Sequence, residues 1–556
     1  MFQSNSITTT DSKSKLSRSL GWLASGLAID LRSLAAFRIG AGTLLLLDLV
    51  LRAMNLTAFY TDEGVFPRTA RIAMDSSDMY DGLARLHWSL HMLSGEVWGQ
   101  VVLFVLAGLA AVCLLAGYRT RLANITSWVL FVSLQDRNPF LGDAGDTLMK
   151  CLLFWGMFLP LGATASVDAL RRIQGGTGWS PKHALHFAKS CRRPRRGTPD
   201  DAGGIVRGDS GYVLSWAGAA FLLQVGVMYW CTAAEKFDPT WIEDFSAIYY
   251  ALSVDMYSRP LGQQLLHYPA LLRWLTIVTY WLEWLGPCLA VAPLLRGWWR
   301  AALVAVFWCW HAGTAVTMQL GVLPWIMVVG WFAFLPGVVW DVGERLVAPF
   351  RRGELARPPH VAATPPAAIQ VSGAANIVAA MLLTYMLVWN VDVVADGLGH
   401  PLGLPPGFKT VAHVTRLNQT WKMFAPRPLR DDGWYVMKGK LRDGSIVNLW
   451  EPGKPLPFKK PPLVMPTYHG ERWCNYLLAI WRPSGAVYRN ELSQWLKRRW
   501  NAQYAQGDPQ REVESLEIIF QLEETPPPGT AQSLVKTYFL WKSQYEAEWK
   551  GPGDTP

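Results

Sequence analysis

The sequence predicts a mainly α-helical membrane protein in which a polytopic bundle of about nine spans is followed by an extracytoplasmic α+β domain. Hydrophobic residues make up 51% of the 556 residues. Apolar runs of roughly 20 residues, the length that crosses the hydrocarbon core, recur between residues 33 and 394. Many of the 29 tryptophans stand at the ends of these runs, where an indole can place its ring in lipid and its N–H at the headgroups.

The predicted spans are separated by short polar loops. They are 33–54, 97–117, 123–135, 147–165, 213–235, 271–294, 299–318, 322–340 and 371–394. The segment 123–135 is the weakest of them because it is short. Between 236 and 270 the chain is amphipathic and too polar to cross, so we expect it to lie at the outer interface or to re-enter.

Loop charges orient this bundle. Lysine and arginine collect in alternate loops, most densely in 166–212, whereas the loops 55–96 and 136–146 are acidic or mixed. Basic loops stay in the cytoplasm. The polar, basic segment 1–32 is therefore expected to be cytoplasmic, and an odd number of spans places residues 395–556 outside, as in a bacterial inner membrane protein.

The bundle is expected to occupy residues 33–394, with a Pro-rich linker at 352–370 before its last span. The outer domain has both strand and helix patterns. Its predicted elements are a hairpin around Asp443-Gly444, strands at 516–522 and 535–541, and helices at 471–482 and 487–500.

Several function classes are excluded by composition and motif. The net charge of +10 comes from basic residues in short loops rather than on one soluble face, which indicates anionic lipid rather than nucleic acid. Five of the seven cysteines fall in apolar runs, so neither a disulfide framework nor a metal site is predicted. The chain also lacks a phosphate-binding loop, a dinucleotide fingerprint and a serine nucleophile elbow.

Lys236 is the first candidate for chemistry, because it follows a full apolar span and precedes a segment that ends the helix. A partly desolvated lysine loses stabilisation of its charged form, so its neutral amine can act as a base. The alternative is an anchoring lysine that reaches the interface and pairs with Glu235 or Asp238.

His311 is the second candidate, since the loop charges place it in the same outer half of the bundle as Lys236. Glu283 stands in mid-span, where it could partner a cation or tune a site. The loop 136–146 could supply carboxylates or an amide to the same cavity. Asp48 and Arg52 are four residues apart and are assigned to bundle packing.

An ordered set of motifs resembles the HTTM family, whose members are multi-pass membrane proteins related to vitamin K-dependent gamma-carboxylase. The likeness covers roughly residues 30–340. The motifs are Ala36–Gly40, Phe59–Pro67, Leu115–Arg121, Arg137-Asn138 with Gly145-Asp146, Phe158–Gly162 and Tyr229–Trp241.

The resemblance implies a function. In the carboxylase, a lysine in a Tyr-x-x-Ala-x-x-Lys-x-x-x-x-Trp segment deprotonates vitamin K hydroquinone, and reaction with O2 then yields a base that removes a γ-proton from a peptide glutamate, which captures CO2. Lys236 stands at the base position and His311 in the family's later His-containing span. The implied catalytic residues are thus Lys236 and His311, and the implied cofactor-binding residues are Trp241, Tyr229, Asn138 and Glu283.

Two departures and two hypotheses remain. Arg137-Asn138 stands near the loop where the carboxylase has a second histidine, and the outer domain has no feature diagnostic of propeptide recognition.

The first hypothesis is an enzyme that binds a vitamin K-like or menaquinol-like quinol and a secreted or membrane peptide. It predicts a deep apolar pocket with Lys236 and His311 within one bridging water. The second is a non-catalytic maturation or export factor, in which Lys236 pairs with Glu235 or Glu283 and no cavity surrounds it.

Overall fold

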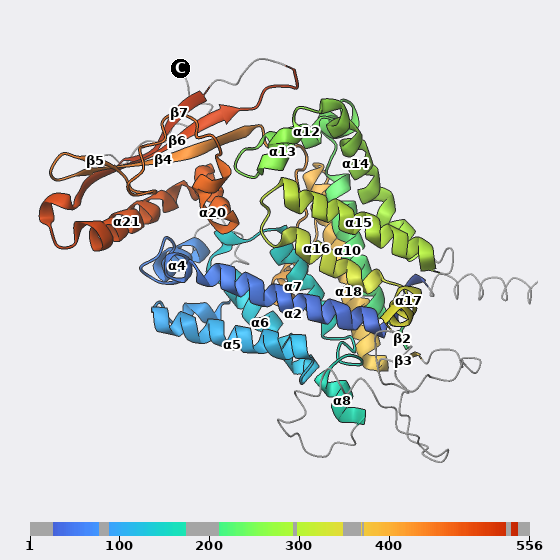
Figure 1. The fold of residues 1–556 in the computed structure, drawn as a ribbon. Coiled ribbons are helices and arrows are strands. Elements are labelled where there is room, and N and C mark those ends of the chain that lie inside the picture. The colour runs from blue at the N-terminus through green and yellow to red at the C-terminus, as the bar shows by residue number, and fades with distance from the viewer. Residues whose placement is uncertain are drawn as a thin grey trace, which may run out of the picture.

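The computed structural model describes residues 26–76, 88–173, 211–292, 297–347, 368–369, 372–529 and 535–542. Helices form most of it, and a four-stranded sheet with its own helices lies against one end of the helical bundle (Figure 1). The described part is therefore a helical bundle joined to a smaller α+β unit.

A helix is present in each of the nine ranges that the apolar runs predict. These helices are α2 (Leu31–Ala53), α5 (Val97–Ala116), α6 (Thr120–Arg137), α7 (Ala144–Gly156), α10 (Trp216–Ala234), α14 (Pro269–Val291), α15 (Trp298–Thr317), α16 (Leu323–Trp331) and α18 (Gly373–Gly397). Shorter helices connect them: α3 (Leu56–Tyr60), α4 (Arg68–Ser76), α8 (Val167–Ile173), α11 (Pro239–Ile242), α12 (Ala247–Ser253), α13 (Pro260–Leu265) and α17 (Gly337–Val347).

Among the described residues, four helices are long and apolar enough to cross a membrane: α2, α5, α10 and α18. The segment predicted as the span 322–340 is instead broken, with a bend of 94° between Leu323–Phe334 and Gly337–Val347. Leu335 is extended because it precedes Pro336, and this ends the helix. α7 has only 13 residues. Nine crossings thus stay a prediction, while a membrane-integral bundle is supported by these apolar helices.

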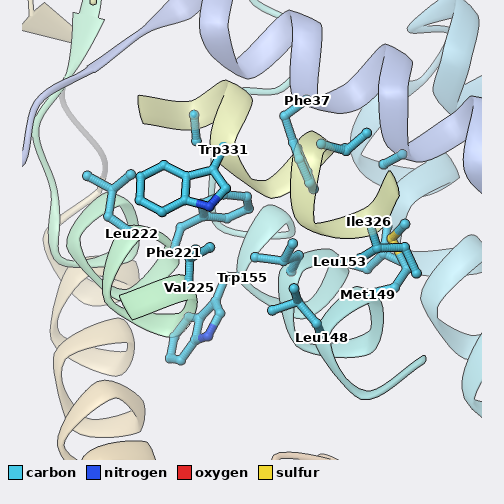
Figure 2. Packing of buried hydrophobic residues seen from close by; sticks show 14 of the residues in the cluster. Phe37, Leu148, Met149, Leu153, Trp155, Phe221, Leu222, Val225, Ile326 and Trp331 are labelled. Atoms are coloured by element: carbon cyan, nitrogen blue, oxygen red, sulfur yellow. The ribbon is translucent and has the colours of Figure 1, made fainter. Parts of the chain in front are cut away.

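Figure 2 shows the centre of the bundle, where the indole of Trp331 lies over Phe221 and Leu222 and the indole of Trp155 lies below Val225. The cluster draws on α2, α7, α10 and α16, and these aromatic rings are almost fully buried. α10 is the most enclosed of the four spanning candidates, with 83% of its apolar window buried inside the protein. It is therefore the central helix, and residues on every side of it meet other parts of the chain.

The outer unit is an antiparallel sheet with strand order β5-β4-β6-β7, formed by β5 (Ile446–Asn448), β4 (Asp431–Leu441), β6 (Val513–Glu524) and β7 (Val535–Lys542). The predicted hairpin is confirmed, and Gly444 takes the left-handed conformation at its turn with φ 86°. The two predicted helices are α20 (Glu471–Trp481) and α21 (Arg489–Trp500). Figure 1 shows both beneath the sheet, on the side that faces the bundle.

A small three-stranded ribbon pairs three short segments that are far apart in the sequence. It consists of β1 (Ile29–Asp30), β2 (Tyr212–Val213) and β3 (Ala368–Ile369), in the order β1-β2-β3. The ribbon lies next to α17 (Figure 1). Most of the predicted basic loop 166–212, most of the Pro-rich linker 352–370 and most of the segment 1–32 lie outside the described residues.

Arg472 of α20 joins the outer unit to the bundle through a buried ion-pair network. Its guanidinium contacts Asp146 at 2.6 Å and Asp48 at 2.9 Å. Arg52 completes the network, because it pairs with Asp48 at 2.7 Å and with Asp146 at 2.9 Å. The predicted Asp48–Arg52 pair is thus confirmed, but it also serves the attachment of the outer unit. All four side chains are at least nine-tenths buried.

Replacing Arg472 by Ala should lower the free energy of unfolding by about 3–5 kcal/mol, because Asp48 and Asp146 then share only Arg52 in a site without water. The matched control is Arg442→Ala, which breaks the exposed pair with Glu512 and should cost less than about 1 kcal/mol. Denaturant unfolding of the purified protein in detergent compares the two. Equal losses for both variants would contradict this role for Arg472.

Asp432 should make the stability of the outer unit depend on pH. Burial, with a contribution from Asp255, raises the pKa of this carboxyl to about 7. Lys460 also faces it, and pairs with Asp255 and Glu523. Because the folded pKa exceeds that of the unfolded chain, the folded state binds the extra proton, and stability falls as pH rises from about 4 to about 7.

The slope contributed by Asp432 should approach about 1.4 kcal/mol per pH unit within that window. Asp432→Asn removes the titrating group and should flatten the dependence, as measured by thermal unfolding between pH 4 and pH 8. A slope that is identical in the variant and the parent protein would show that Asp432 titrates as it does in the unfolded chain.

Candidate active site

The end of α10 delivers Lys236 to the interior. Ser215 caps the start of this helix by accepting a hydrogen bond from the Gly218 amide. The helix ends at Ala234, and Asp238 and Pro239 then cap and begin α11. Since proline fits the first turn of a new helix but not the continuation of an old one, the chain turns between these two helices. Lys236 lies at this turn, only 3% exposed.

The Lys236 ammonium is enclosed by a carboxylate and an aromatic ring. Its Nζ lies 2.7 Å from both oxygens of Glu283 on α14. It also lies 4.0 Å from the centre of the Trp241 ring, a cation–π contact. Glu283 is 3% exposed, so neither charge meets solvent. The partner is therefore Glu283, not the adjacent Glu235 or Asp238.

A hydrogen-bonded chain of three side chains is centred on Tyr229 of α10, seven residues before Lys236. The Trp331 indole donates to the Tyr229 hydroxyl at 2.9 Å. The same hydroxyl shares a hydrogen bond with Nε2 of His311, 2.6 Å away, in which the His311 tautomer decides the donor. Tyr229 and His311 are both buried. The hydroxyl and the imidazole thus satisfy each other inside the bundle.

The two groups are connected through the chain, since Tyr229 lies seven residues before Lys236. Within the described residues, no hydrogen bond joins Lys236 directly to His311. The structure thus brings five of the six sequence-predicted site residues into two neighbouring clusters: Lys236, Glu283 and Trp241 in one, and Tyr229 and His311 in the other.

Asn138, the sixth predicted residue, makes its contacts elsewhere. Its side-chain amide donates to the Phe59 carbonyl at 3.3 Å. The loop 136–146 also serves other partners than the predicted cavity. Asp146 binds Arg52 and Arg472, and Asp136 binds Arg416 at 2.6 Å. This loop therefore attaches the outer unit to the bundle.

Trp331 is a site residue that the sequence analysis missed. The available signal was its position inside an apolar run rather than at an end, where an indole N–H must find a partner within the protein. The Phe424 carbonyl was also missed. It accepts a hydrogen bond from the Trp241 indole at 3.0 Å, although it lies far along the chain.

A hollow of about 570 Å³ opens on α10 and α14. It is lined by Trp230, Tyr280, Trp281, Trp284, Leu285 and Cys288. Trp230 is next in sequence to Tyr229, and Trp284 is next to Glu283, so the hollow borders the two helices that carry the buried pair. Neither Lys236 nor His311 lines it. The described residues contain no group of three or more metal-binding side chains.

No family model, curated protein or solved structure matches this chain.

Breaking the Lys236–Glu283 pair on one side only should be strongly destabilising. Lys236→Met leaves a buried carboxylate without its cation, and the free energy of unfolding should fall by about 3–5 kcal/mol. The double variant Lys236→Met/Glu283→Met removes both charges and should recover most of that loss. Unfolding in detergent compares the parent protein, Lys236→Met, Glu283→Met and the double variant. A double variant whose loss equals the sum of the single losses would contradict the pairing.

Proposed function

We propose that the protein is a vitamin K-dependent gamma-carboxylase-like enzyme of the bacterial inner membrane. In this proposal the Lys236 amine deprotonates a quinol-type lipid, and a peptide or protein is modified at the outer face. The observation that carries the proposal is the Lys236–Glu283 pair, buried at the end of α10 beside the Tyr229–His311 hydrogen bond. Buried pairs of ionisable groups enclosed in this way cluster at functional sites.

A quinol suits the chemistry of the surrounding residues. The hollow on α10 and α14 is lined mainly by aromatic side chains, and it is an open depression on the outside of the bundle, where Trp281 and Leu285 are about half exposed. Bound beside the Lys236–Glu283 pair, a reduced naphthoquinone would supply an acidic phenolic hydroxyl. With O2 it would also supply a base strong enough to take a γ-proton from glutamate, to which CO2 would then add.

Lys236 and Glu283 hold one exchangeable proton between them. When that proton resides on the Glu283 carboxyl, the Lys236 amine is neutral and can accept a second proton from the quinol hydroxyl. The resulting ammonium is then stabilised by the Trp241 ring and balances the negative charge left on the quinol oxygen. Tyr229 and His311 lie next to this pair and offer a hydroxyl proton and an acceptor nitrogen.

The outer unit is in position to present a peptide to this site. Its sheet and helices lie against the end of the bundle at which α10 ends (Figure 1). It shares one apolar core with the α3–α4 segment and with Val254 and Met256 of the turn after α12. The peptide would approach from the extracytoplasmic side, the side that the loop charges assign to this unit.

A non-catalytic maturation or export factor is the second candidate function. Two observations favour it. Both Glu283 carboxylate oxygens contact the Lys236 Nζ, and the hollow on α10 and α14 does not include Lys236. In that case the pair would fix α14 to α10, and the outer unit would bind the exported protein without chemical change.

Quinol turnover by the purified protein in nanodiscs separates the two functions. With reduced vitamin K or menaquinol, O2, labelled CO2 and a glutamate-containing peptide, the parent protein should form quinone epoxide. Lys236→Ala should lower the rate by about a hundredfold or more, the contribution of a positioned base. Lys454→Ala, which removes an exposed lysine of the outer unit, should leave the rate unchanged. Equal rates in the parent protein and Lys236→Ala would exclude the base role.

A further inference from the structure

The segment Leu417–Phe424 runs between the last bundle helix and the outer sheet, with Leu417, Gln419 and Trp421 buried and Thr420 and Lys422 exposed. It follows α19 (Pro406–Thr415) and precedes β4. Leu417 and Trp421 are almost fully buried and belong to the apolar core of the bundle. We call Leu417–Phe424 the inserted segment. The polar groups of its buried residues need partners within the protein, because burial separates them from bulk solvent.

Bundle residues provide those partners from three helices. Lys150 of α7 donates to the Asn418 carbonyl at 3.0 Å, and Gln224 of α10 donates to the Gln419 side chain at 2.6 Å. From α18, the Trp389 indole donates to the Gln419 carbonyl at 2.9 Å. In addition, the Thr232 hydroxyl of α10 donates to the Trp421 carbonyl at 2.9 Å. The inserted segment is thus held at successive residues.

The end of the inserted segment reaches the Lys236 cluster. The Phe424 carbonyl accepts a hydrogen bond from the Trp241 indole at 3.0 Å, and this same ring lies 4.0 Å from the Lys236 Nζ. Next to Lys236, the buried Glu235 carboxylate has no hydrogen-bond partner among the residues that the structure describes. The contact from the inserted segment to the Lys236 cluster is therefore the one through Trp241.

We infer that the inserted segment Leu417–Phe424 is a positioning element for Lys236, which holds the Trp241 ring against the ammonium and so sets the balance between its charged and neutral forms. This inference rests on the proposed role of Lys236 as a base. Thr232 and Phe424 are positioning residues in this scheme, since neither touches the amine. The chain reaches β4 at Asp431, seven residues after Phe424, so the position of the outer unit is linked to the geometry of the base.

Thr232→Val is the most conservative test, because valine keeps the shape of threonine but cannot donate to the Trp421 carbonyl. Thr232→Ser keeps the hydroxyl and serves as the rescue variant. Thr384→Val of α18 is the matched control, since the Thr384 hydroxyl donates to the carbonyl four residues earlier. The single Thr232 hydroxyl proton is shared between the corresponding Met228 carbonyl and the Trp421 carbonyl. All variants are made in the full-length protein in nanodiscs.

Three readouts are compared: amide hydrogen exchange of residues 417–424, the pH dependence of Lys236 acylation followed by peptide mass spectrometry, and the pH profile of quinol turnover. In Thr232→Val, exchange should become faster, and acylation of Lys236 at a fixed pH should rise about fivefold, because the ammonium loses part of its cation–π contact. Both pH profiles should move to lower pH. Thr232→Ser and Thr384→Val should superimpose on the parent protein.

Faster exchange in Thr232→Val with unchanged pH profiles would overturn the inference, since the inserted segment would then be structural only. Unchanged exchange would overturn it as well. If the parent protein shows no quinol turnover, the proposed function fails, but acylation and exchange still decide whether the inserted segment positions Lys236.

Should Thr232→Val not fold, Trp241→Phe removes the indole N–H while keeping an aromatic ring, and the same readouts apply. Its control is Trp500→Phe in the outer unit, which also loses an indole bond to a main-chain carbonyl at 3.0 Å.

Discussion

The ion pair of Lys236 and Glu283 joins the end of α10 to the middle of α14 in a place that water does not reach. Neither charge would be tolerated there alone, because the desolvation of a single ion in an apolar bundle costs several kcal/mol. The pair therefore requires that α10 ends where it does, that α14 packs against it, and that Trp241 covers the ammonium. A lysine and a carboxylate held so closely share one proton, which makes the same interaction a candidate for proton transfer.

The pattern of apolar runs and loop charges predicted much of the molecule. A helix formed in every predicted range, and the hairpin at Asp443-Gly444 formed because both strands alternate around a strong turn signal. The break after Phe334 was missed, since Pro336 was read as the interior of an apolar run. Hydropathy is summed over a window of many residues, so it does not register one proline. That proline nevertheless changes the backbone conformation of the residue before it.

For the site, the sequence identified Lys236, Tyr229, Trp241, Glu283 and His311 but could not pair them. Glu235 and Asp238 are near Lys236 in sequence, and only the packing of α14 decides that Glu283 is its partner. Asn138 does not lie in this group, because the loop that carries it attaches the outer unit to the bundle. Contacts between residues far apart in the chain, such as Trp241 with Phe424, leave no local pattern from which to predict them.

The central claim, that a quinol-type lipid meets Lys236 inside this bundle, is tested most directly by the lipid that the protein itself retains. Mass spectrometry of lipids released from the protein after mild detergent extraction identifies it without an assay of turnover. The account predicts a quinone in an amount comparable to the protein, and its loss from Glu283→Gln, in which the buried pair can no longer hold its proton. Retention of phospholipid alone by the parent protein would contradict the account.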